Sequence, residues 1–236
     1  MPKKKTKKKK YTKFLLEFLS IFIAVISAFA LNNWNDNRKD RIAESKILSE
    51  LLSGLEKDKA DVEINMAGHK TGINACKYWR RLINGEETNT DTVPSYYLAL
   101  TRDYTSIQNS SGYETLKARG FELITNDSLR SKIIGLHSFH YQTLQKLEEE
   151  YYESQFQENY FDIINNIIGP ELKFDQQGNI VGMNLPLNIT EVQRNLFLSY
   201  LWKIQFNRRF IEMSYKETKQ NIIELQDEIE AEIKLN

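Results

Sequence analysis

An uninterrupted apolar run near the amino terminus constrains this chain more than any other feature. From Phe14 to Leu31 the sequence reads FLLEFLSIFIAVISAFAL, with three polar residues, Glu17, Ser20 and Ser27. As a helix rising 1.5 Å per residue, this run extends roughly 27 Å, close to the ~30 Å hydrocarbon thickness of a bilayer. The sequence therefore predicts one transmembrane helix, which we place at residues 11–33.

The flanks of this run predict its orientation. Eight lysines precede the first acidic residue, whereas the other flank, NNWNDNRKDR, mixes both signs. Because cytoplasmic flanks carry the excess of Lys and Arg, we expect residues 1–10 to form a cytoplasmic lysine-rich tail. Residues 34–236 then form an extracytoplasmic domain. Tyr11 and Trp34 lie where aromatic rings prefer the membrane interface.

Two other interpretations of the amino terminus stay open. The basic start, the apolar run and Ala28-Phe29-Ala30 also resemble a cleavable signal peptide, although Glu17 and the length of the run favour a retained span. The tract KKKTKKKK is also typical of a nuclear localisation or nucleic-acid patch, which an adjacent membrane span argues against. Beyond the tail, acidic residues outnumber basic ones, so we expect no nucleic-acid partner.

Glu17 is the ionisable residue of the predicted span. Such a residue is by default a candidate functional site, for a helix partner or for a proton path. It follows Lys13 by four residues on the same helix face and lies about one turn inside the cytoplasmic edge. Pairing with this lysine, or reaching into the headgroups, is the simpler expectation.

The residues after the run carry a resemblance to known proteins. An acid, Glu17, and an apolar run containing Ala28 lead into Asn32-Asn33-Trp34-Asn35-Asp36-Asn37-Arg38-Lys39. This stretch resembles a family of small single-pass membrane proteins of unknown function from Bacteroidota, in which Asn-Asn-Trp-Asn-Glu-Asn-Arg-Lys follows the span. The residues predicted for the membrane interface and this motif are Glu17, Asn32, Asn33, Trp34, Asn35, Asn37 and Arg38.

A second stretch is similar to the same family. Its pattern, Tyr-x-x-Leu-Lys-x-x-Gly followed by Leu-Ile-x-Asn-x-x-Leu, is matched here by Tyr113, Leu116, Lys117, Gly120, Leu123, Ile124, Asn126 and Leu129. The resemblance implies an anchor in the bacterial inner (cytoplasmic) membrane, with the N-terminus cytoplasmic and a helical C-terminal domain in the periplasm. It supplies no catalytic residues.

Beyond Trp34 the apolar residues keep a helical spacing, which predicts a mostly α-helical domain. Apolar residues between positions 42 and 55 recur at three- and four-residue steps, so the membrane helix is expected to continue outward as a rod. A second helix is predicted at 65–85. Shorter helices are predicted near 94–103 and 111–119.

The second half of the chain predicts two further long helices and a hairpin. One helix is expected from Asn126 or Asp127, as its N-cap, to about Ile168 before Gly169-Pro170. Residues 172–184 predict a small β-hairpin that turns at Gln177-Gly178. Thr190 and Gln193 form a capping-box pattern that opens the final helix. Together these elements predict an antiparallel bundle about 60 Å tall, from about forty residues per helix at 1.5 Å each.

The final helix carries a regular seam. Ten positions follow one another at alternating four- and three-residue steps, and all but Arg208 and Thr218 are apolar. They are Phe197, Leu201, Ile204, Arg208, Ile211, Tyr215, Thr218, Ile222, Leu225 and Ile229. Such a seam suits either a core within the chain or a coiled coil with a partner chain. The sequence leaves both open.

Chemical signatures are sparse. His137 and His140 are spaced so that two imidazoles lie on one helix face toward a metal, but the third histidine, His69, is distant. They are weak metal candidates, and we expect no cofactor. The single cysteine, Cys76, excludes an internal disulfide. No nucleophile elbow, phosphate loop or dinucleotide fingerprint occurs, so an enzyme is unsupported.

Tyrosines crowd the middle of the chain and suit either a recognition surface or a core. They are Tyr96, Tyr97, Tyr104, Tyr113, Tyr141, Tyr151, Tyr152 and Tyr160. The leading hypothesis is a membrane-anchored extracytoplasmic interaction or scaffold module that meets the lipid bilayer and a protein partner or further copies of itself. The alternatives are a ligand-sensing bundle working with a partner membrane subunit and a metal-dependent enzyme.

Overall fold

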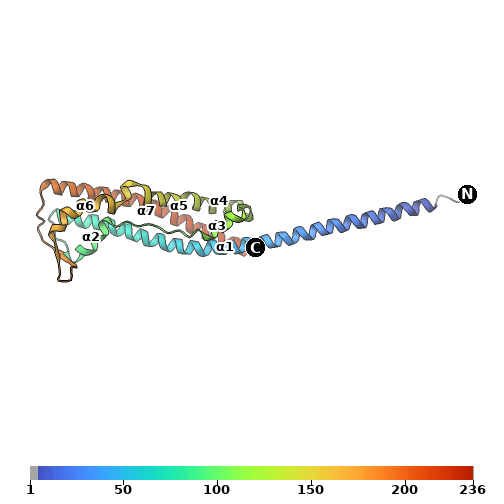
Figure 1. Cartoon of the computed structure of the whole chain (residues 1–236), viewed down its shortest axis with the longest axis horizontal. Coiled ribbons are helices and arrows are strands. Elements are labelled where there is room, and N and C mark those ends of the chain that lie inside the picture. The colour runs from blue at the N-terminus through green and yellow to red at the C-terminus, as the bar shows by residue number, and fades with distance from the viewer. Residues whose placement is uncertain (1–4, 236) are drawn as a thin grey trace.

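The chain folds into one very long helix and a helical bundle built along part of it (Figure 1). The computed structural model describes residues 5–235, with side chains described from residue 13 onward; residues 1–4 of the lysine tail lie outside this range. Helix α1 (Lys5–Ile83) begins in the tail and reaches the far end of the bundle. The mostly α-helical fold predicted from the sequence is confirmed.

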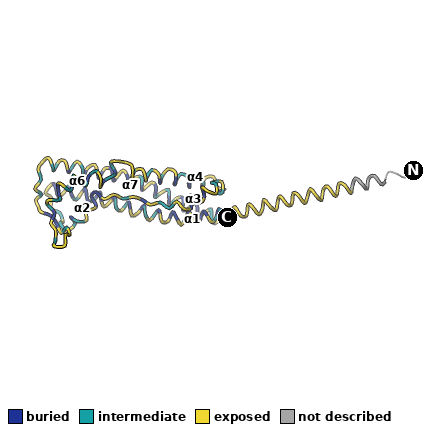
Figure 2. Tube along the Cα trace, viewed as in Figure 1, coloured by how far each residue is buried: buried dark blue, intermediate teal, exposed yellow. Residues whose placement is uncertain are grey.

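One helix in the described part of the chain, Lys13–Ile83, is long and apolar enough to cross a membrane. Its segment up to Ile42 is exposed, and burial begins at Ala43 and Glu44, where the bundle starts (Figure 2). No described part of the chain covers the side chains from Phe14 to Leu31, and all of them are exposed. The apolar segment is therefore free to be covered by something other than this chain.

Helix α1 is continuous, so the predicted separate helix at 65–85 is wrong as a separate element. Asp58, Asn65 and His69 lie on the buried seam of α1, each less than 7% exposed. Because these positions are polar, the apolar repeat that reveals a helix in a sequence is interrupted there. No proline breaks the backbone between the two apolar stretches.

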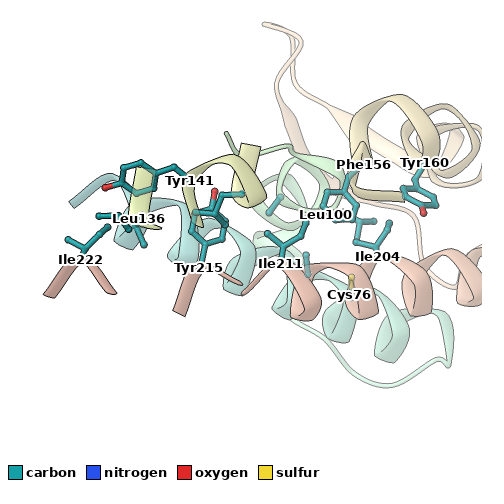
Figure 3. Packing of buried hydrophobic residues seen from close by; sticks show 14 of the residues in the cluster. Cys76, Leu100, Leu136, Tyr141, Phe156, Tyr160, Ile204, Ile211, Tyr215 and Ile222 are labelled. Atoms are coloured by element: carbon teal, nitrogen blue, oxygen red, sulfur yellow. The ribbon is translucent and has the colours of Figure 1, made fainter. Parts of the chain in front are cut away.

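Helix α7 (Glu191–Leu235) returns antiparallel along the bundle part of α1. Paired side chains fix the register: the Arg194 guanidinium donates to Asn84, Arg80 to Gln205, and Lys219 pairs with Glu63. All ten positions of the predicted seam of α7 are buried. The seam therefore serves as a core within the chain, packed with residues such as Cys76, Leu100 and Phe156 (Figure 3).

Thr190 and Gln193 form the predicted capping box at the start of α7. The backbone N–H and the hydroxyl of Thr190 donate to Gln193 Oε1 at 2.9 Å, and the Gln193 N–H donates to Thr190 Oγ1 at 3.2 Å. These bonds satisfy amide groups that a helix start leaves without partners. Two of the short helices also lie where the sequence places them, α2 (Val93–Thr101) and α3 (Ser111–Arg119).

The predicted long helix from Asp127 to Ile168 is wrong as a single element. Helical turns follow one another from Asp127 to Glu150, and residues 151–155 interrupt the α-helix before Phe156. The chain forms α4 (Asp127–Gly135), α5 (Tyr141–Gln145) and α6 (Phe156–Ile168), and π-helical turns precede and follow α5. A carboxylate from outside the segment starts α6: the N–H groups of Phe156 and Gln157 donate to Asp103 at 2.7 and 3.2 Å. A helix start made by a residue 53 positions earlier leaves no local signal in the sequence.

The predicted hairpin near 172–184 is confirmed. Strand β1 (Leu172–Phe174) pairs antiparallel with β2 (Ile180–Met183), and Leu172 lies opposite Met183. Gly178 adopts φ +84° in the turn, a conformation that glycine reaches without a steric penalty. Both Leu172 and Met183 are buried, so the hairpin closes the end of the bundle farthest from the apolar segment.

Gly72 lets the Arg208 side chain pass close to α1. A Cβ at Gly72 would lie 2.4 Å from Arg208 Nε, whereas a Cβ at Gly135 would meet nothing within 4 Å. We expect Gly72→Ala to lower the free energy of unfolding by about 1–3 kcal/mol through overpacking. Gly135→Ala, in a helical backbone, should raise it by about 0.5–1 kcal/mol. Urea denaturation of the full chain in detergent measures both, and equal stabilities would contradict the packing of Arg208 against α1.

Candidate functional site

The first family motif lies on an exposed part of α1 between the apolar segment and the bundle. Asn32, Asn33, Trp34, Asn35, Asn37 and Arg38 are all exposed. Their side-chain contacts in the described structure stay within the helix: Asn32 Nδ2 donates to Asp36 at 3.0 Å, and the Arg38 guanidinium lies 6.0 Å from the Trp34 ring centroid. The motif therefore offers its side chains to surroundings outside the bundle.

Glu17 pairs as the spacing predicts. Its carboxylate lies 3.9 Å from Lys13 Nζ, four residues earlier on α1, and both side chains are exposed. An exposed pair of this kind contributes little to stability. Lys13 therefore supplies Glu17 with a counter-charge from the same helix, and Glu17 requires no second helix for this.

The second family motif is used for packing. Leu116 is fully buried and Tyr113 nearly so, while Gly120 takes φ +99° at the end of α3. Asn126 caps α4 by accepting from the Leu129 N–H at 3.2 Å, and its Nδ2 donates to Glu232 near the end of α7 at 2.7 Å. These residues join α3 and α4 to the end of the bundle nearest the apolar segment.

The two motif regions meet at one surface groove. A groove of about 430 Å³ is lined by Asn37, Arg41 and Glu44 of α1, by Arg119 at the end of α3, and by Glu122 and Leu123 from the α3–α4 connection. The buried Glu44 carboxylate accepts from the Thr125 N–H at 2.8 Å and thereby holds the connection against α1. The groove is open and lined mainly by charged residues, so it lacks the apolar lining that a pocket for an apolar small molecule has.

His137 and His140 do not form a common site. His137 is buried, stacked on the Tyr113 ring at 4.2 Å and edge-on to Tyr141, whereas His140 lies 3.8 Å from the Glu217 carboxylate of α7. Within residues whose side chains are described, no group of three or more His, Cys, Asp or Glu residues is placed to hold a metal ion. Both histidines therefore act here through packing and pairing.

Buried carboxylates bind an extended segment that the sequence analysis did not single out. Residues 102–110 form no helix or strand, and their amide groups donate to acids of neighbouring helices. The Ser106 N–H donates to Glu148 at 3.0 Å and the Asn109 N–H to Asp58 at 2.6 Å. Glu148 also accepts from the hydroxyls of Ser106 and Tyr215. These acids are saturated by protein donors, so they hold the segment in place.

A buried guanidinium closes the end of α2. Arg208 of α7 is fully buried, and its Nη2 donates to the carbonyls of Leu100 and Arg102 at 3.1 and 2.8 Å. A positive charge is favourable at this end of a helix dipole. The guanidinium also lies 4.1 Å from the Phe156 ring centroid. Burial lowers the pKa of Arg208 to about 10, so it stays charged at neutral pH.

His69 is neutral beside this charge. Burial, and then the Arg208 charge, lowers the pKa of His69 to about 3. Its Nδ1 lies 3.2 Å from Arg208 Nη1, and because Arg208 can only donate, His69 Nδ1 accepts. The pair therefore combines one charged donor with one neutral acceptor, and this hydrogen bond joins α7 to α1 inside the core.

Exposed apolar residues outside α1 form a stripe on α7. We define the outer stripe as Val192, Leu196, Trp202, Phe206, Phe210 and Met213, which are between 41% and 77% exposed. Phe206 follows the buried Ile204 by two residues, which turns it by about 200° to the opposite face of the helix. The rings of Trp202 and Phe206 stack at 5.4 Å. Helix α7 thus carries one apolar face inside the bundle and a second one outside.

Tyrosines extend the outer stripe sideways. The ring of Tyr151 lies 6.5 Å from Phe210, and Tyr151 and Tyr152 are exposed. A groove of about 340 Å³, lined by Lys146, Leu147 and Tyr151 among others, adjoins them. By contrast, Tyr113, Tyr141 and Tyr160 are core residues. The predicted tyrosine cluster therefore divides into a core set, an exposed pair beside the outer stripe, and three half-buried residues, Tyr96, Tyr97 and Tyr104.

Comparisons with protein-family models, with curated proteins and with solved structures found no match to this chain. The resemblance to the Bacteroidota family accordingly stays a prediction.

The stacked His137 predicts an acid-sensitive core. Burial lowers the pKa of His137 to about 4, below the value near 6.5 of an unfolded histidine. The unfolded chain therefore binds the additional proton, and stability is lost as the pH falls from 6.5 toward 4, by up to about 1.4 kcal/mol per pH unit. We expect His137→Phe, which keeps the stacking, to lose less stability between pH 7 and pH 5 than the unchanged protein.

Urea denaturation of both proteins at the two pH values measures this difference. Burial raises the pKa of the Glu148 and Asp58 carboxyls, which gives a trend of opposite sign, but that trend is common to both proteins. A pH dependence identical in the two proteins would mean that folding does not change the pKa of His137, which would contradict its burial.

Proposed function

We propose that this chain is a membrane-anchored interaction module. In this proposal, α1 anchors it in the bacterial inner membrane with the lysine tail in the cytoplasm, and residues 34–236 form a periplasmic bundle that binds a protein. The observation that carries the binding role is the outer stripe, whose Trp202, Phe206 and Met213 are each more than half exposed. Exposed contiguous apolar patches of several hundred Å² on soluble domains usually mark interaction sites.

The anchoring role is supported by the apolar segment of α1 and its flanks. The segment extends out of the bundle and is exposed along its whole length. Exposed side chains such as Phe14, Phe22 and Phe29 are unfavourable in water and favourable in hydrocarbon. The eight lysines before the first acid supply the orientation through the positive-inside bias.

The ligand-sensing alternative has weaker support. It requires an apolar pocket with a few convergent polar groups between helices. The groove where the two motifs meet is instead open and lined by charged residues such as Arg41, Arg119 and Glu122. The centre of the bundle near Cys76 and Leu100 is filled by side chains (Figure 3).

Cysteine labelling tests the anchor and its orientation. Cys76 is fully buried, and burial raises its pKa to about 12, so the unchanged protein should not react with a membrane-impermeant maleimide. Ser53 is exposed on the bundle part of α1. We expect Ser53→Cys to be labelled from outside in spheroplasts and Thr6→Cys, in the lysine tail, to be labelled after permeabilisation only. The chain should stay with the membrane in alkaline carbonate. Recovery in the soluble fraction, or the reverse labelling pattern, contradicts the proposal.

Photo-crosslinking tests the binding surface. A benzophenone amino acid at Trp202, in the outer stripe, should form covalent adducts in intact cells, because a bound protein would cover this position. The same amino acid at Ser53, on an exposed polar part of α1, should form few. Equal yields at the two positions, or no adduct at Trp202, contradict the role of the outer stripe.

A further inference from the structure

We propose that the outer stripe is the contact between two copies of this chain that stand side by side, with α7 parallel to α7 of the second copy. The inference rests on the proposed function, because it assumes that α1 is a membrane anchor and that the outer stripe binds protein. It goes beyond that function by naming the partner as a second copy.

Anchoring determines the geometry of such a contact. Two copies in one membrane point the same way, so their outer stripes lie at equal height. Their two-fold axis then runs parallel to the rods, and residues near the axis meet their own counterparts. A charged residue there would face a like charge, so a surface suited to this contact needs an uncharged central line.

The central line of the outer stripe meets this requirement. Val192, Ser199, Phe206 and Met213 follow one another at seven-residue intervals, the repeat of parallel helices that supercoil about each other, and none is charged. One interval beyond Met213 the line reaches Gln220, and the next position is Asp227. The line therefore has large apolar side chains as far as Met213, in the half of α7 that is farther from the apolar segment, and its first charged position is Asp227.

One pair of opposite charges also meets across the edges of the outer stripe in this arrangement. Arg209 and Lys216 are exposed along one edge of α7. Glu153 lies along the other edge, where its carbonyl accepts from Asn207 Nδ2 at 3.1 Å; Lys203 shares this edge about one turn away. A parallel two-fold contact places each edge against the opposite edge of the second copy, so Arg209 comes to the level of the second copy's Glu153.

The area is adequate for two tethered chains. Aromatic side chains bury about 150–250 Å² each, so the three aromatic members of the stripe, about half exposed, offer roughly 300 Å² per copy, and the three aliphatic members add to this area. Standard interfaces bury about 800 Å² per partner, and smaller ones are weak. Confinement to one membrane raises the effective concentration of the second copy and thereby supports a weak contact.

The arrangement also separates the two apolar segments. In each copy α7 lies between the outer stripe and α1, and packed helices are about 8–10 Å apart. The two α1 helices are then about 25–30 Å apart, three such spacings in all. The apolar segments should therefore not touch one another, which distinguishes this dimer from one held together by its spans.

Disulfide trapping in membranes of cells producing the full chain tests the inference. Ser199 is exposed on the central line between Val192 and Phe206, and Ser199→Cys replaces a hydroxyl by a thiol of similar size. Under copper-phenanthroline oxidation we expect Ser199→Cys to form a disulfide-linked dimer. Matched variants, Ser53→Cys on α1 and Ala24→Cys in the apolar segment, should form at least about tenfold less, as chance collisions would. A dimer with Ala24→Cys in place of Ser199→Cys overturns the inference.

A disrupting variant and the photo-crosslinker separate the remaining outcomes. Phe206→Asp places two acids at the axis and should lower the Ser199→Cys dimer at least about tenfold, with unchanged circular dichroism and melting temperature. An adduct at Trp202 that contains two copies of this chain supports the inference. An adduct with a different protein overturns the second copy as partner and leaves the interaction module standing, whereas no adduct removes both.

Discussion

The antiparallel pairing of α1 with α7 is the contact on which the rest of the structure depends. The two helices lie along each other through the whole bundle, and the register is fixed by Arg194 with Asn84 at the far end and by Lys219 with Glu63 near the middle. Helices α2 and α3 pack on α1, and α4, α5 and α6 pack on α7, so that the inner apolar faces of the pair are buried. Because α1 continues beyond the pair without a break, the apolar segment inherits its direction from the bundle.

Polar groups inside this pair determine the path of the connecting chain. Asp58 and Glu148 are buried carboxylates, and each takes hydrogen bonds from the extended 102–110 segment. Burying an ionised group without partners would cost several kcal/mol, so these acids and the amides of the segment require one another. Arg208 applies the same principle to carbonyls at the end of α2. The irregular segment between α2 and α3 is thus held to the helices through several of its backbone amides.

The sequence predicted the elements with local signals and missed those made by distant partners. The capping box at Thr190, the hairpin turn at Gly178 and the seam of α7 all depend on residues close in sequence, and the structure confirms them. The start of α6 depends on Asp103, a residue distant in sequence, so no local pattern revealed it. The buried face of α1 contains polar residues that interrupt its apolar repeat, so the sequence did not reveal that α1 is continuous. The outer stripe did have a local signal, Trp202 and Phe206 four residues apart on the face opposite the seam, but the sequence alone does not say which apolar face is inside.

The two apolar faces of α7 explain why a rigid anchor matters in the proposed arrangement. Phe206 adjoins Gln205, which pairs with Arg80 of α1, and Arg80 lies 49 residues beyond the end of the apolar run at Leu31. Along one helix this distance is about 70 Å, so the outer stripe stands well away from the bilayer. A flexible linker would let the stripe reach any height and face any direction. A continuous helix instead fixes its height and direction, and therefore selects partners that present a complementary surface at the same distance from the same membrane.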